Sequence, residues 1–370
     1  MVCGEPNQNK EAGKKFPQDL TKVQESVGRL ALYSTVLCWP AISFRLSRKI
    51  LEFAKNKQNL GHTKSFLYFV FARLVHDFFT GNWQEIAEFD EPLVERSLKI
   101  GEFFFTTNYL AFLCHIKIQQ GNVARARELI DKVEEISLVF EHDYARTQKY
   151  YLKAMWLLKQ NMLEEALKEA EEGISFAQKT GYIPQLFSLK AFKAQTQVLL
   201  GDNQGAEETL EGLDKIRSEE NVVPLYLNYN LRSWFLLDLF RMEKARQSGS
   251  RADLARAQKK ALKSGKKMIR TSRKLASERT ENFKWMGLCY WLAGKQKRAV
   301  KWWEKSFKEG KNLEAALELA KAYSVAGRKL SEKGSQYKEI LGVNSQEYLQ
   351  MANSLIKELS LHEDLILYPD

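Results

Sequence analysis

Small residues recur every 40 positions through the first half of the chain, and this register constrains the fold more than any other feature. The recurring positions are Gly81, Gly121, Asn161 and Gly201. Five residues after each of them stands Ile86, Ala126, Ala166 or Ala206. A period of about 20 to 50 residues is typical of repeat proteins, whose units bury their apolar faces only by stacking on neighbours. The sequence therefore predicts an all-α helical-repeat protein that holds partners rather than performing chemistry.

The chemistry of these positions explains why helices end there. Glycine adopts positive φ just past a helix end without steric cost, and asparagine tolerates that conformation better than most residues. Capping residues follow at once, as at Asn122 and Asp202. Apolar residues then return at steps of three and four, which predicts amphipathic helices over about 123–136 and 163–177. Each landmark thus predicts a helix end, a turn and a new helix.

Composition agrees with a large helical core. Of the 370 residues, 44% are hydrophobic and 12% aromatic, which is too apolar for a disordered chain. The four cysteines form no CxxC pair and the first residues carry no apolar export signal, so we expect reduced thiols and a cytoplasmic protein. The most apolar stretch, residues 30–46, contains Pro40 and Arg45. A helix pair broken at Pro40 is therefore favoured over a transmembrane segment.

The helical segments predict one continuous structural unit. Residues 1–18 are expected to form a flexible polar tail, and residues 19–370 a single helical-repeat solenoid. The predicted helix pairs cover residues 19–57, 63–100, 103–140, 143–179, 183–219 and about 222–275. The register stretches in the last pair and resumes at Gly294.

The segment from Phe283 carries the spacing of a known repeat. The matching residues are Phe283, Met286, Gly287, Tyr290, Gly294, Ala299 and Trp303, and a further copy begins with Ala316, Leu319, Ala320, Tyr323 and Gly327. Small residues at these positions let helices approach closely while aromatic residues fill the gaps between units. The chain thus resembles the tetratricopeptide-like helical repeat proteins. The resemblance implies a right-handed α-solenoid with a period near 40 residues, acting as a protein-interaction scaffold or signalling regulator.

Residues 230–330 also resemble a narrower group. The segment 284–288, followed by Gly294, Ala299 and Trp303, is similar to the C-terminal repeat region of multidomain signalling ATPases. In those proteins an attached nucleotide cyclase or Ser/Thr kinase domain performs the chemistry. The resemblance implies a sensor and docking arm, and this chain would supply only the arm.

No pattern supplies catalytic chemistry. The nearest approach to a phosphate-binding loop, residues 61–65, lacks the first glycine and the Gly-Lys pair. The dipeptides His76-Asp77 and His142-Asp143 would need further ligands from other helices to hold a metal ion, so surface or capping roles are favoured. We therefore predict no catalytic residue, no cofactor and no metal site.

Two other combinations fit the core better than a site. Cys114 and His115 are adjacent, and adjacent residues on a helix do not face each other. Trp302 and Trp303 stand beside lysines and could stack on bases, but Trp303 falls on a repeat packing position. Both pairs are therefore expected in the core.

Positive charge is concentrated in one segment. The chain has 57 Lys and Arg against 46 Asp and Glu, a net charge of +11. Residues 241–274 hold 13 of the basic residues against two acidic ones. Steps of three and four place six of them on one helical face: Arg256, Lys260, Lys263, Lys267, Arg270 and Lys274. Leu254, Ala257, Ala261, Met268 and Leu275 make the opposite, apolar face.

Four interpretations of this basic face remain open. It is a solvated outer surface, or it docks an acidic protein, because a concentrated field steers association. Nucleic acid would also suit the charge, but no RNA-binding motif or interleaved aromatic residue occurs in it. An anionic membrane surface is less favoured because the apolar side is rich in alanine.

Helical repeats usually bind partners along the groove lined by the first helix of each pair. A clamp for a C-terminal carboxylate would place Lys and Asn at groove positions that here are Ala111/His115, Tyr151/Met155 and Ala191/Gln195. An apolar, aromatic groove for an extended or helical peptide fits better. We therefore predict a non-enzymatic docking or regulatory module for a protein or peptide partner. The alternatives are a detached regulatory arm of a cyclase or kinase signalling ATPase, and an RNA-binding helical-repeat protein.

Overall fold

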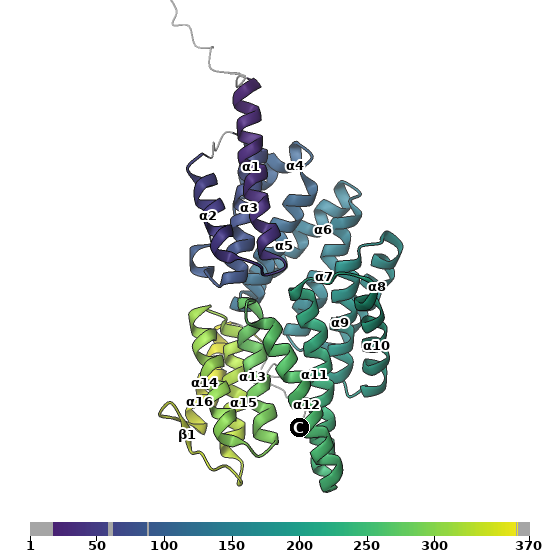
Figure 1. Cartoon of the computed structure of the whole chain (residues 1–370), viewed down its shortest axis with the longest axis vertical. Coiled ribbons are helices and arrows are strands. Elements are labelled where there is room, and N and C mark those ends of the chain that lie inside the picture. The colour runs from purple at the N-terminus through teal and green to yellow at the C-terminus, as the bar shows by residue number, and fades with distance from the viewer. Residues whose placement is uncertain (1–17, 58–61, 87–88, 360, 362–370) are drawn as a thin grey trace, which may run out of the picture.

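The protein is an α-helical repeat structure in which consecutive helices pack together in pairs (Figure 1). The computed structural model describes residues 18–57, 62–86, 89–359 and 361. The predicted tail, residues 1–18, lies outside the described residues except for Gln18, where α1 begins.

The elements follow the predicted pairs closely. The first ten helices are α1 (Gln18–Cys38), α2 (Phe44–Lys55), α3 (Thr63–Thr80), α4 (Glu91–Lys99), α5 (Phe103–Gln120), α6 (Val123–Val139), α7 (Asp143–Lys159), α8 (Leu163–Thr180), α9 (Ile183–Leu199) and α10 (Asn203–Glu219). The remaining helices are α11 (Pro224–Gln247), α12 (Arg251–Ser272), α13 (Ala276–Leu292), α14 (Gln296–Asn312), α15 (Ala316–Ser331) and α16 (Ser345–Glu358). A short 3₁₀ turn, η1 (Trp83–Glu85), separates α3 from α4.

The 40-residue landmarks are helix ends, as predicted. All four residues take positive φ: Gly81 at 93°, Gly121 at 79°, Asn161 at 61° and Gly201 at 84°. The small residues five positions later are almost fully buried in the second helices at Ala126, Ala166 and Ala206. The prediction is wrong at Ile86. That residue is extended and follows η1 rather than lying in a helix, because α4 begins only at Glu91.

The odd-numbered helices form an inner layer and the even-numbered helices pack outside it. Each odd-numbered helix packs against the next one, from α1 to α15. Helices α5 and α13 are buried on nearly all sides, whereas α8, α10 and α12 keep an exposed polar face. Burial of the first helix of each pair is typical of stacked repeats.

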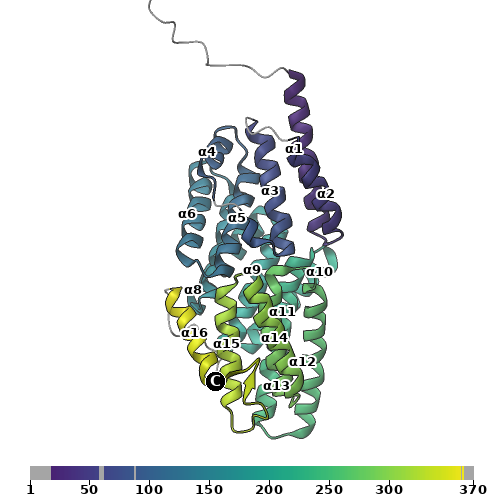
Figure 2. The ribbon, with the colours of Figure 1, turned by 90° about the vertical axis from the view of Figure 1, so that its left-hand side faces the viewer.

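The C-terminal repeats return to contact the N-terminal ones. Helix α13 packs against α3, and α15 packs against α5 (Figures 1 and 2). At this contact a Cβ on Gly81 would lie 2.7 Å from a methyl of Leu313, and one on Gly121 would lie 2.6 Å from Leu359. These two glycines therefore lie directly against residues of the C-terminal repeats.

The segment that carries the tetratricopeptide spacing packs as that spacing requires. A Cβ on Gly287 would lie 2.4 Å from Nε1 of Trp303, so only glycine lets α14 approach α13 this closely. Trp303 is fully buried, as predicted, and its Nε1 donates to the carbonyl of Lys284. A two-residue hairpin of β1 (Glu339–Ile340) and β2 (Val343–Asn344) interrupts the helices before α16.

The apolar stretch at residues 30–46 is a broken helix pair, as expected. Helix α1 ends at Cys38, and the side chain of Ser43 caps α2 by accepting from the amide of Leu46. In the part of the chain that the structure describes, no helix has the length and apolar character needed to cross a membrane.

Candidate functional site

The basic helix predicted from the sequence is α12, and its two faces lie as expected. The side chain of Ser250 begins the helix by accepting from the backbone N–H of Asp253. On the inward face Ala261 and Met268 are fully buried, as predicted. The predicted helix extends to about residue 275, whereas α12 ends at Ser272, so Lys274 and the buried Leu275 lie in the turn before α13. The predicted basic side chains are all exposed: Arg256, Lys260, Lys263, Lys267, Arg270 and Lys274.

Two of these cations are tied to the rest of the fold. Nζ of Lys260 lies 3.2 Å from Oδ1 of Asp238, a buried carboxylate on α11. Nζ of Lys274 donates to the carbonyl of Ala41 at 2.6 Å and so joins the end of α12 to the α1–α2 turn. Both side chains therefore have a structural role besides any role in binding.

The other four cations are much less constrained. Arg256 lies 3.8 Å from Asp253, but both side chains are more than half exposed, so this pair contributes little. Within the described residues, no acidic side chain forms an ion pair with the remaining three: Lys263, Lys267 and Arg270. Their charge is directed entirely to solvent.

Helix α14 continues the basic surface, which sequence reasoning missed. It exposes six further cations: Lys297, Arg298, Lys301, Lys305, Lys308 and Lys311. Its two acidic residues are only partly exposed, and Glu309 is paired with Arg279 at 2.6 Å. The three- and four-residue steps of these lysines were a readable signal. We call the exposed cations of α12 and α14 the basic surface.

Charge changes sign along the outer helices. Helix α8 contains two lysines against five glutamates, and α10 contains two basic residues against five acidic ones. Helix α12 contains eight basic residues against one aspartate, and α14 six against two. Among the even-numbered outer helices from α8 to α14, the excess of positive charge is thus confined to α12 and α14.

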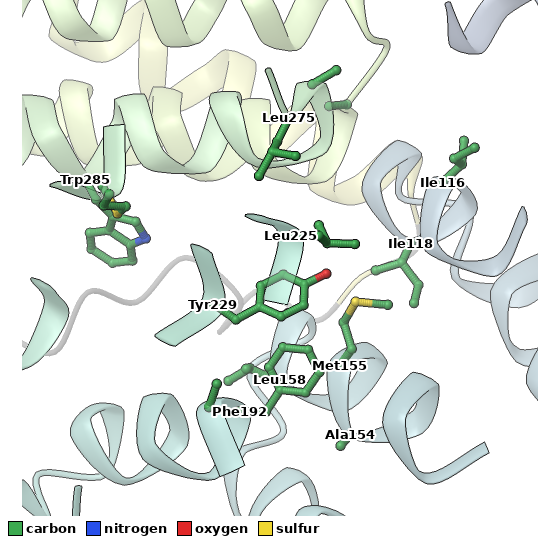
Figure 3. Close-up of a cluster of buried hydrophobic side chains, with 14 of the residues drawn as sticks. Ile116, Ile118, Ala154, Met155, Leu158, Phe192, Leu225, Tyr229, Leu275 and Trp285 are labelled. Carbon is green, nitrogen blue, oxygen red and sulfur yellow. The ribbon is translucent and has the colours of Figure 1, made fainter. Parts of the chain in front are cut away.

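The predicted groove along the first helices is closed, which corrects the expectation of an open peptide site. Its residues are all at least nine-tenths buried: Ala111, His115, Tyr151, Met155, Ala191 and Gln195. Side chains from α5, α7, α9 and α11 converge there, with Trp285 of α13 across from them (Figure 3). The later repeats fold back over this face and cover these groove residues.

One small cavity remains in this interior. Trp39, Phe112 and Tyr226 form aromatic walls, and the rings of Trp39 and Tyr226 lie 5.9 Å apart between centroids. Gln148 also lines it, and its Oε1 accepts no hydrogen bond from a described residue. About 20 Å³ is open to the centre of a water molecule, which is room for about one water. A peptide does not fit there.

A network of buried charges joins the two ends of the solenoid. Nζ of Lys159 on α7 lies 2.6 Å from a carboxylate oxygen of Glu281 and 2.6 Å from one of Glu318. Nζ of Lys284 lies 2.8 Å from the other oxygen of Glu318. Lys159 comes from the middle repeats and the glutamates from the last ones, so these ion pairs hold the closed arrangement together.

Arg232 and Lys321 complete the network. Arg232 Nη1 lies 2.5 Å from Glu278 and 3.1 Å from Glu281. Nζ of Lys321 donates at 2.6 Å to the backbone carbonyl of Lys159, at the C-terminal end of α7. We call these seven residues the interior charge network: Lys159, Arg232, Glu278, Glu281, Lys284, Glu318 and Lys321.

The pKa values show which charges are stabilised by their partners. Burial raises the pKa of Glu281, but Arg232 and Lys159 outweigh it and lower that pKa to about 2. Burial lowers the pKa of Lys159, but Glu281 and Glu318 outweigh it and raise it. At Lys321 burial dominates and lowers the pKa to about 8. With four cations and three carboxylates in the network, Lys321 is the surplus cation.

The combinations that resembled catalytic or metal sites are structural. Nδ1 of His76 lies 3.1 Å from Asp77 and its Nε2 lies 3.3 Å from the carbonyl of Phe44, so neither nitrogen is left for a metal. Nδ1 of His142 caps α7 by accepting from the amide of Ala145. No group of three or more metal-ligating side chains was found among the described residues.

The remaining candidates also lie in the core or cap a helix. Burial raises the pKa of the Cys114 thiol, whose Sγ donates to the carbonyl of Ala126, so it is a poor nucleophile. Burial, with Lys159 and Arg232 nearby, lowers the pKa of His115 to about 3. In the segment weighed as a phosphate loop, residues 61–65, the first residue lies outside the described residues, and the next one, His62, caps α3.

The comparisons with known proteins identify no family. No protein-family model matches the chain, and no curated protein matches it. Among solved structures, the chain is similar to a Rap protein complexed with Competence and Sporulation Factor. The TM-score is 0.46 at 11% sequence identity, and the match covers 91% of this chain and 97% of that one.

Proposed function

We propose that this chain is a non-enzymatic docking module of the cytoplasm that binds an acidic protein partner on the basic surface of α12 and α14. The observation that supports this most is the set of exposed cations without acidic neighbours, above all Lys263, Lys267 and Arg270. A field of one sign steers an oppositely charged partner and rejects basic ones. The closed interior favours the outer surface over a peptide groove.

An acidic protein fits this surface better than nucleic acid does. Single-stranded nucleic acids bind through aromatic side chains on which bases stack, besides contacts to phosphate. Helix α12 contains no aromatic residue. On α14, Trp303 is buried, and Trp302 is partly buried, 5.5 Å from Phe283 with Nζ of Lys305 over its ring. The basic surface therefore offers charge without an open stacking platform.

The same surface would serve a regulatory arm. If the chain works with a separate cyclase or kinase, that catalytic protein is a candidate for the acidic partner. The arm itself is expected to bind and turn over no ATP, since neither a phosphate loop nor a metal-carboxylate site was found in its described residues. Nucleotide turnover by a contaminant-free preparation would refute the non-enzymatic assignment.

The direct test is capture of partners from the native cell extract at low salt. The test variant combines Lys263→Glu, Lys267→Glu and Arg270→Glu, which leaves Lys260 and its ion pair with Asp238 intact. A control variant with the same charge change combines Lys179→Glu, Lys215→Glu and Lys338→Glu, exposed positions elsewhere. Both variants should unfold within about 0.5 kcal/mol of the wild type, because exposed charges contribute little.

The proposal predicts that the test variant loses its acidic partners while the control keeps them. Capture by the wild type should also weaken as salt rises, because the Debye length falls from about 10 Å at 0.1 M. RNA rather than protein in the wild-type fraction, lost in the test variant, would identify a nucleic-acid surface instead. Equal capture by wild type and test variant would refute docking on the basic surface.

A further inference from the structure

A second exposed surface lies on the first helix pair. Six of its large apolar side chains are exposed: Val23, Tyr33, Val36, Ile42, Leu46 and Phe53. The exposed fraction is 48% for Leu46 and 55% for Phe53. We call these residues the α1–α2 face. Several large apolar side chains exposed on one helix pair make it a candidate interaction site.

The α1–α2 face is the side of the pair that no other repeat covers. Figure 2 shows α1 and α2 at the edge of the molecule, and both pack mainly on each other and on α3. Gly28 of α1 approaches Ser65 of α3 closely, and Gln24 donates to the carbonyl of Lys57 at 3.1 Å. The two helices thus run side by side, and the exposed apolar residues lie away from α3.

This pair is also joined to the solenoid by a small core of its own. The cluster is separate from the main core and contains six buried residues: Val27, Ala31, Leu51, Ala54, Phe69 and Ala72. Three of the six are alanines, so little apolar area is buried there. A terminal repeat usually presents a polar outer face. Here the outer face exposes large apolar side chains among charged ones, and no other described repeat covers them.

The charges around the apolar residues indicate which kind of partner binds the α1–α2 face. Two cations of α2, Arg45 and Lys49, are exposed within one helical turn of Leu46 or Phe53, whereas Arg48 and Lys55 line a cleft on the side of α2 that faces α3. Neither Arg45 nor Lys49 forms an ion pair with a described residue, and Glu52, the only acidic residue of α2, lies in the cleft with Arg48. A second copy of this chain would bring the same two cations against them, which is unfavourable. Acidic groups flanking an apolar stripe would complement both features.

We propose that the α1–α2 face binds an acidic amphipathic helix of a partner protein. A helix suits it because two adjacent helices form a groove for a third, as α3 fills the groove on their other side. The partner helix places apolar residues at three- and four-residue steps against Ile42, Leu46 and Phe53, and its carboxylates reach the two cations of α2 beside them. This site is independent of the basic surface of α12 and α14.

Fluorescence anisotropy of a labelled peptide with the full-length chain tests the proposal. The peptide is a designed helix of about 20 residues with leucines on one face and glutamates beside them. A second peptide of the same composition alternates leucine and glutamate, which is the period of a strand. The test variant combines Leu46→Ser and Phe53→Ser. The control variant combines Leu138→Ser and Val139→Ser, apolar residues at the end of α6 that are exposed to 67% and 64%.

The helical peptide should bind the wild type and the control, and bind the test variant at least about tenfold more weakly. The alternating peptide should bind weakly to all three. The triple variant of α12 should bind the helical peptide as the wild type does, which separates this site from the proposed function. Equal binding of both peptides, or no effect of the test variant, would overturn the proposal. So would a dimer lost in the test variant, or binding to phosphatidylserine vesicles with no peptide binding.

Discussion

Lysines of the interior charge network and lysines of the basic surface have opposite environments in the same fold. Lys159 is buried against two carboxylates, whereas Lys263 and Lys267 are exposed and have no acidic partner among the described residues. The buried group carries nearly balanced charge and joins distant repeats. The exposed lysines Lys263 and Lys267 belong to a surface of one sign of charge and form no ion pair with another described element. The difference indicates that the interior charges stabilise the closed solenoid, while the outer charges are available to a partner.

The largest expected effect comes from breaking the interior charge network. Lys159→Met leaves Glu281 and Glu318, both buried, each with one cation fewer. Removing one member of a buried ion pair typically costs about 3 to 5 kcal/mol, because the remaining charge stays buried. Chemical denaturation measures this loss, and a variant as stable as the wild type would show that the network does not hold the solenoid closed.

Low pH should reduce the free energy of unfolding through groups in the interior, while the charge of the outer surface stays the same. The pKa of His115 is lowered to about 3 from 6.5, so below pH 6.5 the unfolded chain takes up a proton that the folded chain does not. Stability is then lost as pH falls from 6.5 toward 3, by about 1.4 kcal/mol per pH unit from this group. His115→Gln should flatten the slope between pH 6.5 and 4.5. Unchanged slopes would mean that His115 titrates normally.

Glu281 acts in the same direction at lower pH. Its folded pKa of about 2 lies below the unfolded value of 4.5, so its contribution is present above pH 4.5 and is lost as pH falls toward 2. The outer surface consists of lysines and arginines, which keep their charge over this whole range. Acid unfolding should therefore begin while the basic surface still carries its full charge.

The third prediction tests packing without changing charge. Ala126 is buried between α5 and α6, and Ala124 is exposed two residues earlier on the same helix. Ala126→Trp should overfill this contact and destabilise the protein by about 1 to 3 kcal/mol. Ala124→Trp is the matched control and should unfold nearly as the wild type does. Thermal melting compares them, and equal melting would make the 40-residue register coincidental.

The smallest effect on stability is expected at the surplus cation. Lys321→Met removes a buried charge whose pKa burial has already lowered to about 8, and it leaves three carboxylates with three cations. The change should be below about 1 kcal/mol or stabilising, because apolar replacement of buried charge is often neutral. A loss as large as that of Lys159→Met would show that Lys321 is an equal member of the network.

The sequence predicted the local features of this fold and missed the distant ones. The helix ends at Gly81, Gly121 and Gly201 depend on the backbone conformation of a single residue, so a glycine at that position in the sequence reveals them. The faces of α12 depend on a period of three to four residues. Lys159 meets its partners 122 and 159 residues further along the chain. No local pattern encodes that separation, so closure of the groove could not be predicted.

For the candidate site, too, the sequence predicted the local features and missed the contacts between helices. The exposure of Lys263 and Lys267 follows from the helical period alone, whereas the ion pair of Lys260 with Asp238 requires knowledge of how α11 and α12 pack. The extension onto α14 was readable in its lysine spacing. That α14 and α12 both belong to the outer layer depends on how the repeats pack, which the lysine spacing does not show.

Lysine-reactivity footprinting tests the central claim most directly. An amine-acetylating reagent is applied to the folded chain with and without an acidic protein that the wild type captures and the triple variant of α12 does not, and mass spectrometry reads each lysine. Lys159 and Lys284 should stay unreactive throughout because they are buried. Lys263, Lys267 and Lys301 should react in the free chain and be protected when this protein is bound. Protection elsewhere with none on α12 or α14, or reaction of the buried lysines in the folded chain, would contradict this account.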